Sequence, residues 1–269
     1  MKHITIDCYG ASQHLLNDLT TVYETLNYLG YHFNLEPIAP PHIIPYYYGR
    51  VKKDSGISAY VLLKGGHITI HTFPFRECYF VDVFSSVDFD ENAIRDYFMD
   101  NLPYSIDASN FEKIDRTKQR FDMSPYAPDC DFGPHLMTEI HVKKEITMDT
   151  MYDFLEGFVS KINMDPIIRT VVNKDKIQDP SYMSGIVIIA QSHIAFHYNI
   201  KEKIILADLF SCAPFNYDEV ESLFKELGTI KSNVLVPRGT KHIYRVNSKI
   251  TDDELKASTL WQKNIGITR

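Results

Sequence analysis

Two stretches of the chain begin with a short run of apolar and polar residues typical of a strand, and each run leads into an amphipathic helix. The runs are His3 to Tyr9 and His135 to His141. The apolar residues that follow recur at helical spacing: Leu15, Leu16, Leu19, Val22, Tyr23 and Leu26 in the first stretch, and Met151, Phe154, Leu155, Phe158, Val159 and Ile162 in the second. Ser12 is the predicted N-cap of the first helix, and Gly30 is its predicted end.

After each first helix come two runs rich in β-branched and aromatic residues, which predict a pair of strands. A second helix is predicted after each pair, near Asp90 to Met99 and near Tyr217 to Leu227. Asn216 and Gly228 stand at the two ends of the later helix, where capping residues are expected. The two halves of the chain therefore show the same order of elements.

An internal repeat connects the two strand pairs. Moving the chain by 126 residues places Ser58 to His71 over Ser184 to His197, with matching serine and histidine positions. The same offset places Asp82-Val-Phe-Ser-Ser86 over Asp208-Leu-Phe-Ser-Cys212. One offset over nearly thirty positions indicates a tandem duplication.

The repeat suggests a division into a first copy, 1–114, a linker, 115–134, and a second copy, 135–269. The linker is rich in charge, Asp and Pro and has no periodicity. Strands occur in runs between helices without strict β-α-β alternation, which favours a layered α+β fold over a Rossmann fold. No glycine-rich phosphate-binding motif contradicts this interpretation.

Composition narrows the possible partners. The net charge of -7 and the lack of a long Lys/Arg run argue against a nucleic-acid partner. The longest apolar run, Ile186 to Ala190, is far too short to span a membrane, and the opening residues lack the apolar segment of a signal peptide. The four cysteines form no C-x-x-C pair. We expect a cytoplasmic monomer or homodimer that acts on a small molecule.

The repeated block resembles the pyruvoyl-dependent S-adenosylmethionine decarboxylase family. Bacterial members carry Glu-Ser-His, Ile-His-Thr-Trp-Pro-Glu and Val-Asp-Val-Phe-Thr-Cys. The first copy has His67-Ile-Thr-Ile-His71-Thr-Phe-Pro74 and Val81-Asp-Val-Phe-Ser85, and the second has Gln191-Ser192-His193 and Asp208-Leu-Phe-Ser-Cys212. The resemblance implies a four-layer αββα sandwich built from the two copies, and a lyase that functions in polyamine biosynthesis.

The family resemblance also implies self-cleavage between Gln191 and Ser192. In the family, the serine attacks the preceding carbonyl, and β-elimination then leaves a pyruvoyl group whose ketone forms a Schiff base with the substrate amine. Gln191 replaces the usual Glu, a change expected to slow cleavage without preventing it. Gly65 and Gly66 replace both residues in the first copy, so no pyruvoyl cofactor can form there.

By the same resemblance, one composite site is intact and one is inactive. Cys212, twenty residues after Ser192, is the expected proton donor, while Ser58 and His71 of the first copy assist cleavage. Ser184 and His197 are second choices for these two roles.

Several neighbouring residues also have plainer interpretations. A Ser-His step in a strand is usually only a hydrogen-bonded pair, and Cys212 alone would be read as a small core residue. Asp82 and Asp208 are interpreted as structural because both copies keep them. His193 and His197 share one strand face, but without an evident third ligand we expect no metal.

The substrate-binding positions depart most from the family. Where the family has a carboxylate that binds the ribose, this chain has Phe75, with Lys201 at the equivalent place in the second copy. Glu77 could partly substitute if the strand continues that far. Phe73 keeps an aromatic residue at the Trp position, and Tyr48, with its neighbours Tyr46 and Tyr47, is a candidate for stacking. The substrate is therefore S-adenosylmethionine or a plain amino acid such as ornithine or arginine, and an uncut, non-catalytic paralogue is the competing interpretation.

Overall fold

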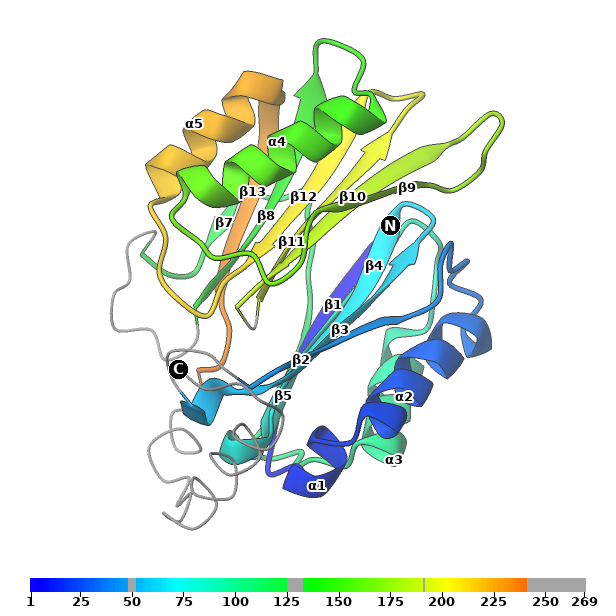
Figure 1. Ribbon diagram of the computed structural model, residues 1–269, viewed down its shortest axis with the longest axis vertical. Helices are drawn as coiled ribbons and strands as arrows, with labels where there is room; N and C mark the ends of the chain where they lie inside the picture. The colour runs from blue at the N-terminus through cyan, green and yellow to red at the C-terminus, as the bar shows by residue number, and fades with distance from the viewer. Residues whose placement is uncertain (48–51, 125–132, 191, 241–269) are drawn as a thin grey trace.

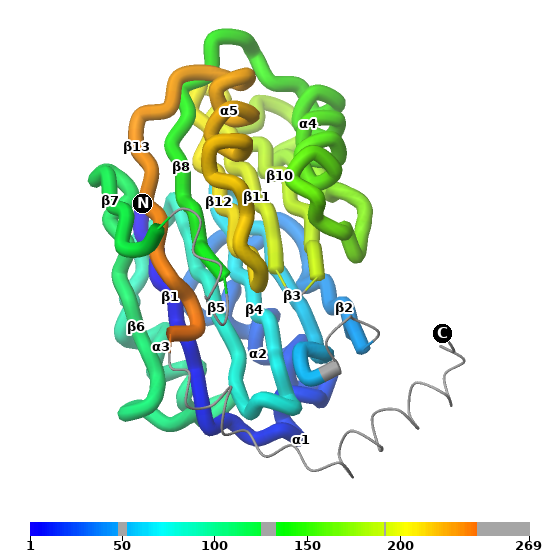
Figure 2. Tube along the Cα trace, turned by 90° about the vertical axis from the view of Figure 1, so that its left-hand side faces the viewer, coloured from blue at the N-terminus to red at the C-terminus, as the bar shows by residue number. Residues whose placement is uncertain are grey.

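Two sheets lie face to face at the centre of the molecule, and helices cover the outer face of each (Figure 1). The computed structural model describes residues 1–47, 52–124, 133–190 and 192–240. Seen from the side, the second half of the chain again lies above the first (Figure 2). The layers follow the order helix, sheet, sheet, helix, so the expected αββα sandwich is confirmed.

The first sheet has six strands, all paired antiparallel in the order β2-β3-β4-β5-β1-β6. They are β1 (Lys2–Tyr9), β2 (His42–Tyr46), β3 (Gly56–Leu63), β4 (Gly66–Phe73), β5 (Cys78–Ser85) and β6 (Asn110–Lys113). The β3–β4 register places Ser58 directly opposite His71. These two residues therefore project from the same face of the sheet.

The second sheet has seven strands in the order β7-β13-β8-β12-β11-β10-β9. They are β7 (Arg120–Phe121), β8 (Pro134–Val142), β9 (Val171–Lys174), β10 (Tyr182–Ile189), β11 (Ser192–Asn199), β12 (Ile204–Phe210) and β13 (Gly228–Pro237). Among the strands of the described residues, only β7 pairs parallel, alongside β13. Ser184 lies opposite His197, which repeats the pairing in the first sheet.

The helices follow the predicted order. In the first half they are α1 (Gln13–Leu16), α2 (Leu19–His32) and α3 (Glu91–Asn101), and in the second half α4 (Met148–Lys161) and α5 (Tyr217–Leu227). Asn216 caps α5 as expected, because its side chain accepts hydrogen bonds from the N–H groups of Asp218 and Glu219. Two short 3-10 turns, η1 (Lys52–Asp54) and η2 (Pro74–Arg76), also lie in the described residues.

The predicted start of the first helix is confirmed, because Ser12 is the N-cap residue of α1, but the predicted end at Gly30 is wrong. The helical segment breaks after α1, and Asp18 starts α2 by accepting a hydrogen bond from the Thr21 N–H group. Ser12 makes no side-chain capping bond. Gly30 lies inside α2, which continues to His32, and a Cβ atom at this position would meet Pro37 at ordinary contact distance. A single glycine inside a helix is tolerated because its cost is only about 1 kcal/mol relative to alanine.

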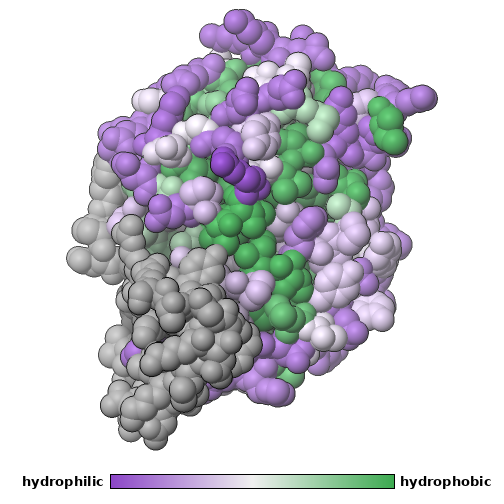
Figure 3. Space-filling view, in the orientation of Figure 1, coloured by the Kyte–Doolittle hydropathy of each residue, from purple (hydrophilic) through white to green (hydrophobic). Residues whose placement is uncertain are grey.

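Each sheet has its own apolar core beneath its helices. In the first, residues such as Ile4 and Val81 pack with Leu26 of α2, and in the second Phe196 packs with Phe158 of α4. The inner faces of the sheets are different. Apolar residues fill the region near β2 and β9, in a cluster of Tyr60, Leu62, Ile186, Ile188 and Ala195. In the view of Figure 3, apolar residues are also exposed at mid-height of the molecule.

The segment 115–134 connects the two sheets. It contributes Arg116, which is buried, and strand β7 at the edge of the second sheet. The exact division into 1–114, 115–134 and 135–269 stays a prediction. Among the helices of the described ranges, none combines the length and apolar character needed to cross a bilayer.

Candidate active site between the sheets

The middle of the interface between the two sheets is polar. Six histidines project into it because alternate residues of a strand face the same side. They are His3 from β1, His67 and His71 from β4, His135 from β8, and His193 and His197 from β11. All six are at most 2% exposed, which is unusual for so many ionisable side chains.

Four of these histidines form two equivalent chains that cross between the sheets. In one, the Ser58 hydroxyl lies 2.8 Å from His71 Nδ1, and His71 Nε2 lies 2.9 Å from His193 Nδ1. In the other, the Ser184 hydroxyl lies 2.8 Å from His197 Nδ1, and His197 Nε2 lies 2.7 Å from His67 Nδ1. Each chain therefore joins a serine and histidine of one copy to a histidine of the other.

Both chains end near Asp82. Its Oδ2 atom lies 3.3 Å from His67 Nε2 and 3.4 Å from His193 Nε2, while its Oδ1 atom lies 2.5 Å from His3 Nε2. His135 Nε2 is 3.3 Å from Oδ2. Burial alone would raise the pKa of Asp82, but the surrounding imidazoles, His3 foremost, hold it well below its usual value. Asp82 is therefore a buried carboxylate anion.

The repeat-equivalent carboxylate, Asp208, has a different partner. Arg116 Nη1 lies 2.9 and 2.7 Å from its two oxygens, and Arg116 Nη2 donates to the carbonyl oxygen of Ala207. This guanidinium holds the pKa of Asp208 far below its usual value, against the opposing effect of burial. The duplication has thus produced two carboxylates in unlike surroundings.

Burial sets the protonation state of most of the histidines. It lowers the pKa of His71, His193 and His197, and it lowers the pKa of His135 to about 4. For His71 and His197, the neighbouring histidine of the chain lowers the pKa further. At neutral pH these four imidazoles are therefore uncharged, and each has one N–H group and one acceptor nitrogen.

Ser192 and Cys212 meet at one end of this polar layer. Ser192 is the first residue of β11, its side chain is buried, and its hydroxyl accepts a 2.8 Å hydrogen bond from the Cys212 N–H group. Cys212 packs against an aromatic cluster that includes Phe73 and Phe80 of the first copy and Phe210 of the second. The structure therefore brings together Ser192, Cys212 and the aromatic residue expected at the substrate.

Ser58 and His71 belong to the same end of the polar layer. The His71 ring lies 5.6 Å from Phe210, and it bonds to His193, the residue directly after Ser192. Strand alternation points the Ser192 and His193 side chains to opposite faces of β11. His71, and through it Ser58, is thus linked to the side chain of the residue next to Ser192, while the Cys212 N–H group contacts the Ser192 hydroxyl.

Ser184 and His197 belong to the opposite end, near the Gly65–Gly66 turn. His197 lies 5.6 Å from Phe84, and a Cβ atom at Gly66 would come within 2.1 Å of the Phe84 carbonyl oxygen. At the position of Cys212, the Ser86 hydroxyl instead donates to the Lys64 carbonyl oxygen. The first copy therefore lacks the serine and has no space for one.

The remaining residues expected to bind the substrate do not all lie in one cluster. Phe73 is fully buried in the aromatic cluster, and Phe75 is 7% exposed. The strand was expected to continue to Glu77, but it ends at Phe73, and Pro74 leads into the turn η2. Glu77 is exposed at the end of that turn with a φ of 52°, so the expectation that it shares a strand face with Phe75 is wrong. Gln191 and Tyr48 lie outside the described residues.

The sequence showed only two histidines on one strand face, whereas the structure brings together three or more side chains of the kinds that bind metal ions. Three overlapping sets have ligand atoms close enough for one ion: His3, Asp82, His135 and Asp208; His67, His197 and Asp208; and His67, Asp82 and His193. Both nitrogens of His197 already bond to other side chains. In the first set, arginines donate to the Nδ1 atoms of His3 and His135, which leaves the protons on the nitrogens that face the carboxylates.

Sequence reasoning also missed four buried polar residues: His3, His135, Arg116 and Arg238. His3 and His135 lie near the start of equivalent strands in the two copies, so the repeat could have indicated that both histidines matter. Arg116 lies in the expected linker, where no pattern in the sequence pointed to it. Arg238 follows β13, donates to Asp7 at 2.6 Å, and lies 5.2 Å over the Phe210 ring.

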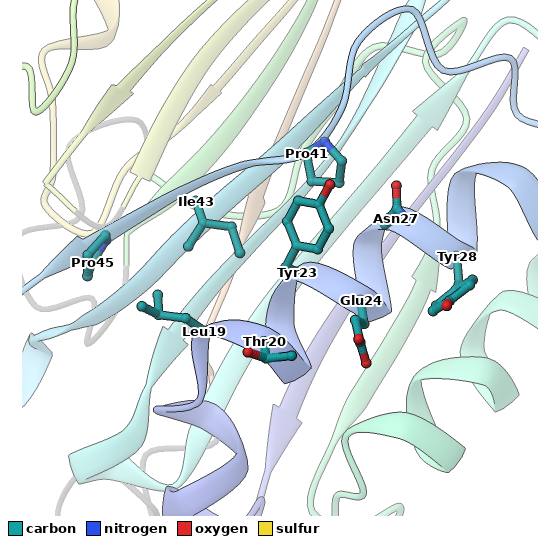
Figure 4. Close-up of a pocket in the computed structure, with 9 residues that line it drawn as sticks. All are labelled: Leu19, Thr20, Tyr23, Glu24, Asn27, Tyr28, Pro41, Ile43 and Pro45. Atoms are coloured by element: carbon teal, nitrogen blue, oxygen red, sulfur yellow. The ribbon is translucent and has the colours of Figure 1, made fainter.

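A surface groove of about 560 Å³ lies between α2 and β2. Figure 4 shows Tyr23 of α2 facing Pro41, with Ile43 of β2 beside them. No candidate catalytic residue is among the nine residues that line it. The groove is therefore separate from the polar layer.

Comparisons with known proteins agree with this geometry. A search of curated proteins finds no match for the chain. The family model described as S-adenosylmethionine decarboxylase matches residues 2–117 and 135–236, which is most of the chain and both copies. This family consists of decarboxylases that depend on a pyruvoyl group. The chain belongs to the S-adenosylmethionine decarboxylase family.

Proposed function

We propose that this chain is a self-processing, pyruvoyl-dependent decarboxylase that cleaves itself between Gln191 and Ser192. The observation that carries the proposal is the asymmetry between the two ends of the polar layer. One end combines Ser192 and Cys212 with Ser58 and His71. The other end has Gly66 and Ser86 at the equivalent places. Only one end can therefore produce the cofactor.

The residues around Ser192 fit a pyruvoyl precursor. Its hydroxyl is buried and serves as an acceptor for the Cys212 N–H group, which leaves its own proton available to a base. A pyruvoyl group formed at this position would supply an electron sink for the loss of carbon dioxide. The aromatic cluster beside Cys212 would exclude water from that position.

Ser58 and His71 would serve the cleavage step. His71 is neutral because burial lowers its pKa, so one of its ring nitrogens can accept a proton. The Ser58 hydroxyl, 2.8 Å from Nδ1, can exchange its proton with this base. Cys212 would supply the proton that replaces carbon dioxide, because its backbone already contacts the side chain of Ser192.

The substrate is proposed to be an amino acid smaller than S-adenosylmethionine. Phe75 has no oxygen to pair with ribose hydroxyls, and Glu77 sits on an exposed turn instead of a strand. Two buried hydroxyls without acceptors would each cost about 1–3 kcal/mol. Ornithine and arginine make no such demand, and S-adenosylmethionine is the alternative that the family favours.

The deciding experiment is the intact mass of the purified protein under denaturing conditions. We expect two fragments that meet between Gln191 and Ser192, a single chain for Ser192→Ala, and normal cleavage for the matched control Ser86→Ala. A wild-type protein that stays at 31.1 kDa would instead identify an uncut paralogue with a binding role.

A further inference from the structure

We infer that His67, Asp82 and His193 bind a divalent metal ion of the zinc type in the polar layer between the two sheets. The ligand atoms are His67 Nε2, Asp82 Oδ2 and His193 Nε2, and all three lie within 4.8 Å of one another. Two ligands come from the first copy and one from the second, so the ion would join the copies. This inference goes beyond the proposed function and does not depend on cleavage.

The stacking of the two sheets brings the three side chains together. In the β4–β5 ladder His67 lies opposite Phe84, two residues from Asp82, so His67 and Asp82 project from the same face as diagonal neighbours. His193 projects from β11 of the opposite sheet, and its ring lies 5.2 Å from that of His67. All three residues are at most 1% exposed. An ion bound here would be enclosed by protein.

The spacing of the ligand atoms fits a tetrahedral ion. Zinc binds imidazole nitrogen and carboxylate oxygen at about 2.0–2.2 Å, so two ligand atoms of a tetrahedron lie about 3.3 Å apart. Asp82 Oδ2 lies 3.3 Å from His67 Nε2 and 3.4 Å from His193 Nε2. Hydrogen bonds between ionised groups are shorter, at about 2.7–2.9 Å. Both distances therefore match the edges of a metal site better than direct hydrogen bonds.

A buried nitrogen without a partner supports the same site independently. His193 Nε2 faces Asp82, yet it makes no hydrogen bond within the described part of the chain. A buried polar atom left in this state costs about 1–3 kcal/mol, and a bound ion is one of the usual reasons for it. The other ring nitrogen, Nδ1, lies 2.9 Å from His71 Nε2. The nitrogen that lacks a partner is thus the one that points at the carboxylate.

The second nitrogen of each histidine also suits a metal ligand. A metal-bound histidine normally donates its other ring N–H group to a neighbouring acceptor, which fixes the orientation of the ring. His67 Nδ1 lies 2.7 Å from His197 Nε2, and His193 Nδ1 lies 2.9 Å from His71 Nε2. An imidazole nitrogen can accept such a bond. Each of the two ligands therefore has an acceptor in place.

The distribution of charge favours this set over the other two. Arg116 contacts both oxygens of Asp208, and that aspartate belongs to both of the other sets. A metal ion bound there would compete with a guanidinium for the same oxygens. Asp82, by contrast, has only histidines within ion-pair distance among the described residues. It is therefore the buried carboxylate that can take a metal ion as its cation.

The metal content of the full-length protein tests the inference directly. The protein is produced in medium with added zinc and separated by gel filtration in the presence of EDTA, which removes ions held at the surface. We expect about one zinc ion per chain, because the ligands are buried. X-ray absorption at the zinc edge should show imidazole nitrogen and carboxylate oxygen at about 2.0–2.2 Å. Protein without zinc, or zinc without imidazole ligands, would overturn the inference.

Two substitutions distinguish this set of ligands from the others. His193 belongs only to the proposed set, and Asp208 belongs only to the other two. His193→Gln should lower the zinc content at least about tenfold, whereas the matched control Asp208→Asn should keep about one ion per chain. Equal loss in both variants, loss in Asp208→Asn alone, or unchanged zinc in His193→Gln would overturn the inference. If a variant does not fold, the absorption spectrum of the unsubstituted protein decides.

Intact mass separates this inference from the proposed function. A chain that holds zinc and stays uncut would contradict the proposed function and leave the metal site standing. A chain that is cut at Ser192 but contains no zinc would overturn the metal site alone.

Discussion

His71 Nε2 lies 2.9 Å from His193 Nδ1, although 122 residues separate them in the chain. The first residue belongs to one copy of the duplicated unit and the second to the other. This contact links His71, and through it Ser58, to the residue directly after Ser192, whereas Ser184 and His197 form the equivalent chain with His67. The composite character of the site therefore has a direct test.

Ser58→Ala should slow cleavage at Ser192 by about 100-fold, because it removes the hydroxyl that exchanges its proton with His71. Ser184→Ala is the matched control: it removes an equally buried hydroxyl from an equal 2.8 Å bond to His197. Its cleavage should be normal. The measurement is the ratio of cut to uncut chain over time. Slowing by Ser184→Ala alone would reverse the assignment of the halves.

Phe75→Glu should increase the release of carbon dioxide from S-adenosylmethionine, because it returns a carboxylate to the position where the family binds ribose. The wild-type protein should turn over ornithine or arginine in preference. The assay compares carboxyl-labelled S-adenosylmethionine, ornithine, arginine and lysine, with protein already shown to be cut. Rapid turnover of S-adenosylmethionine by the wild-type protein would contradict the argument from Phe75.

Arg116→Leu should destabilise the protein by about 3–5 kcal/mol, because it leaves Asp208 buried without its cation. The free energy of unfolding in urea measures this loss. Arg169→Leu is the control, since Arg169 pairs with Glu156 but its side chain is 84% exposed. We expect no measurable loss there. A double substitution that also makes Asp208 apolar should recover part of the stability of Arg116→Leu.

Stability should fall as the pH is lowered from about 6.5 to 4. The pKa of His135 is about 4 in the folded protein and 6.5 when exposed, so the unfolded chain binds the proton first. His71, His193 and His197 have lowered pKa values and act in the same direction. Each adds up to about 1.4 kcal/mol per pH unit to the slope of the unfolding free energy.

His135→Gln checks the sign and size of this dependence. It should lower the slope of the unfolding free energy against pH by up to the equivalent of one bound proton. The free energy is measured by urea unfolding between pH 4 and 6.5. His14→Gln, at an exposed residue of α1, is the control and should leave the slope unchanged. A protein that becomes more stable as the pH falls through this range would show that the buried histidines are charged.

The local sequence pattern was sufficient to predict most of the elements of the fold. The strands at β1 and β8, the helices α3, α4 and α5, and the repeat of serine and histidine positions all follow from spacing along the chain. Strand alternation and helical periodicity depend on neighbours a few residues apart, so a single sequence contains them. The break between α1 and α2 was missed because the helical spacing of apolar residues continues across it, although Ser12 is the N-cap residue of α1 and Asp18 that of α2.

The sequence by itself determined the duplicated unit, the residues that face the interior and the one copy that retains a serine at the cleavage position. Only the tertiary structure decided which histidine meets which, that both histidine chains end near Asp82, and that Arg116 and Arg238 belong to the site. These contacts join residues that are 15 to 231 positions apart. They depend on how the two sheets stack, which no local periodicity specifies.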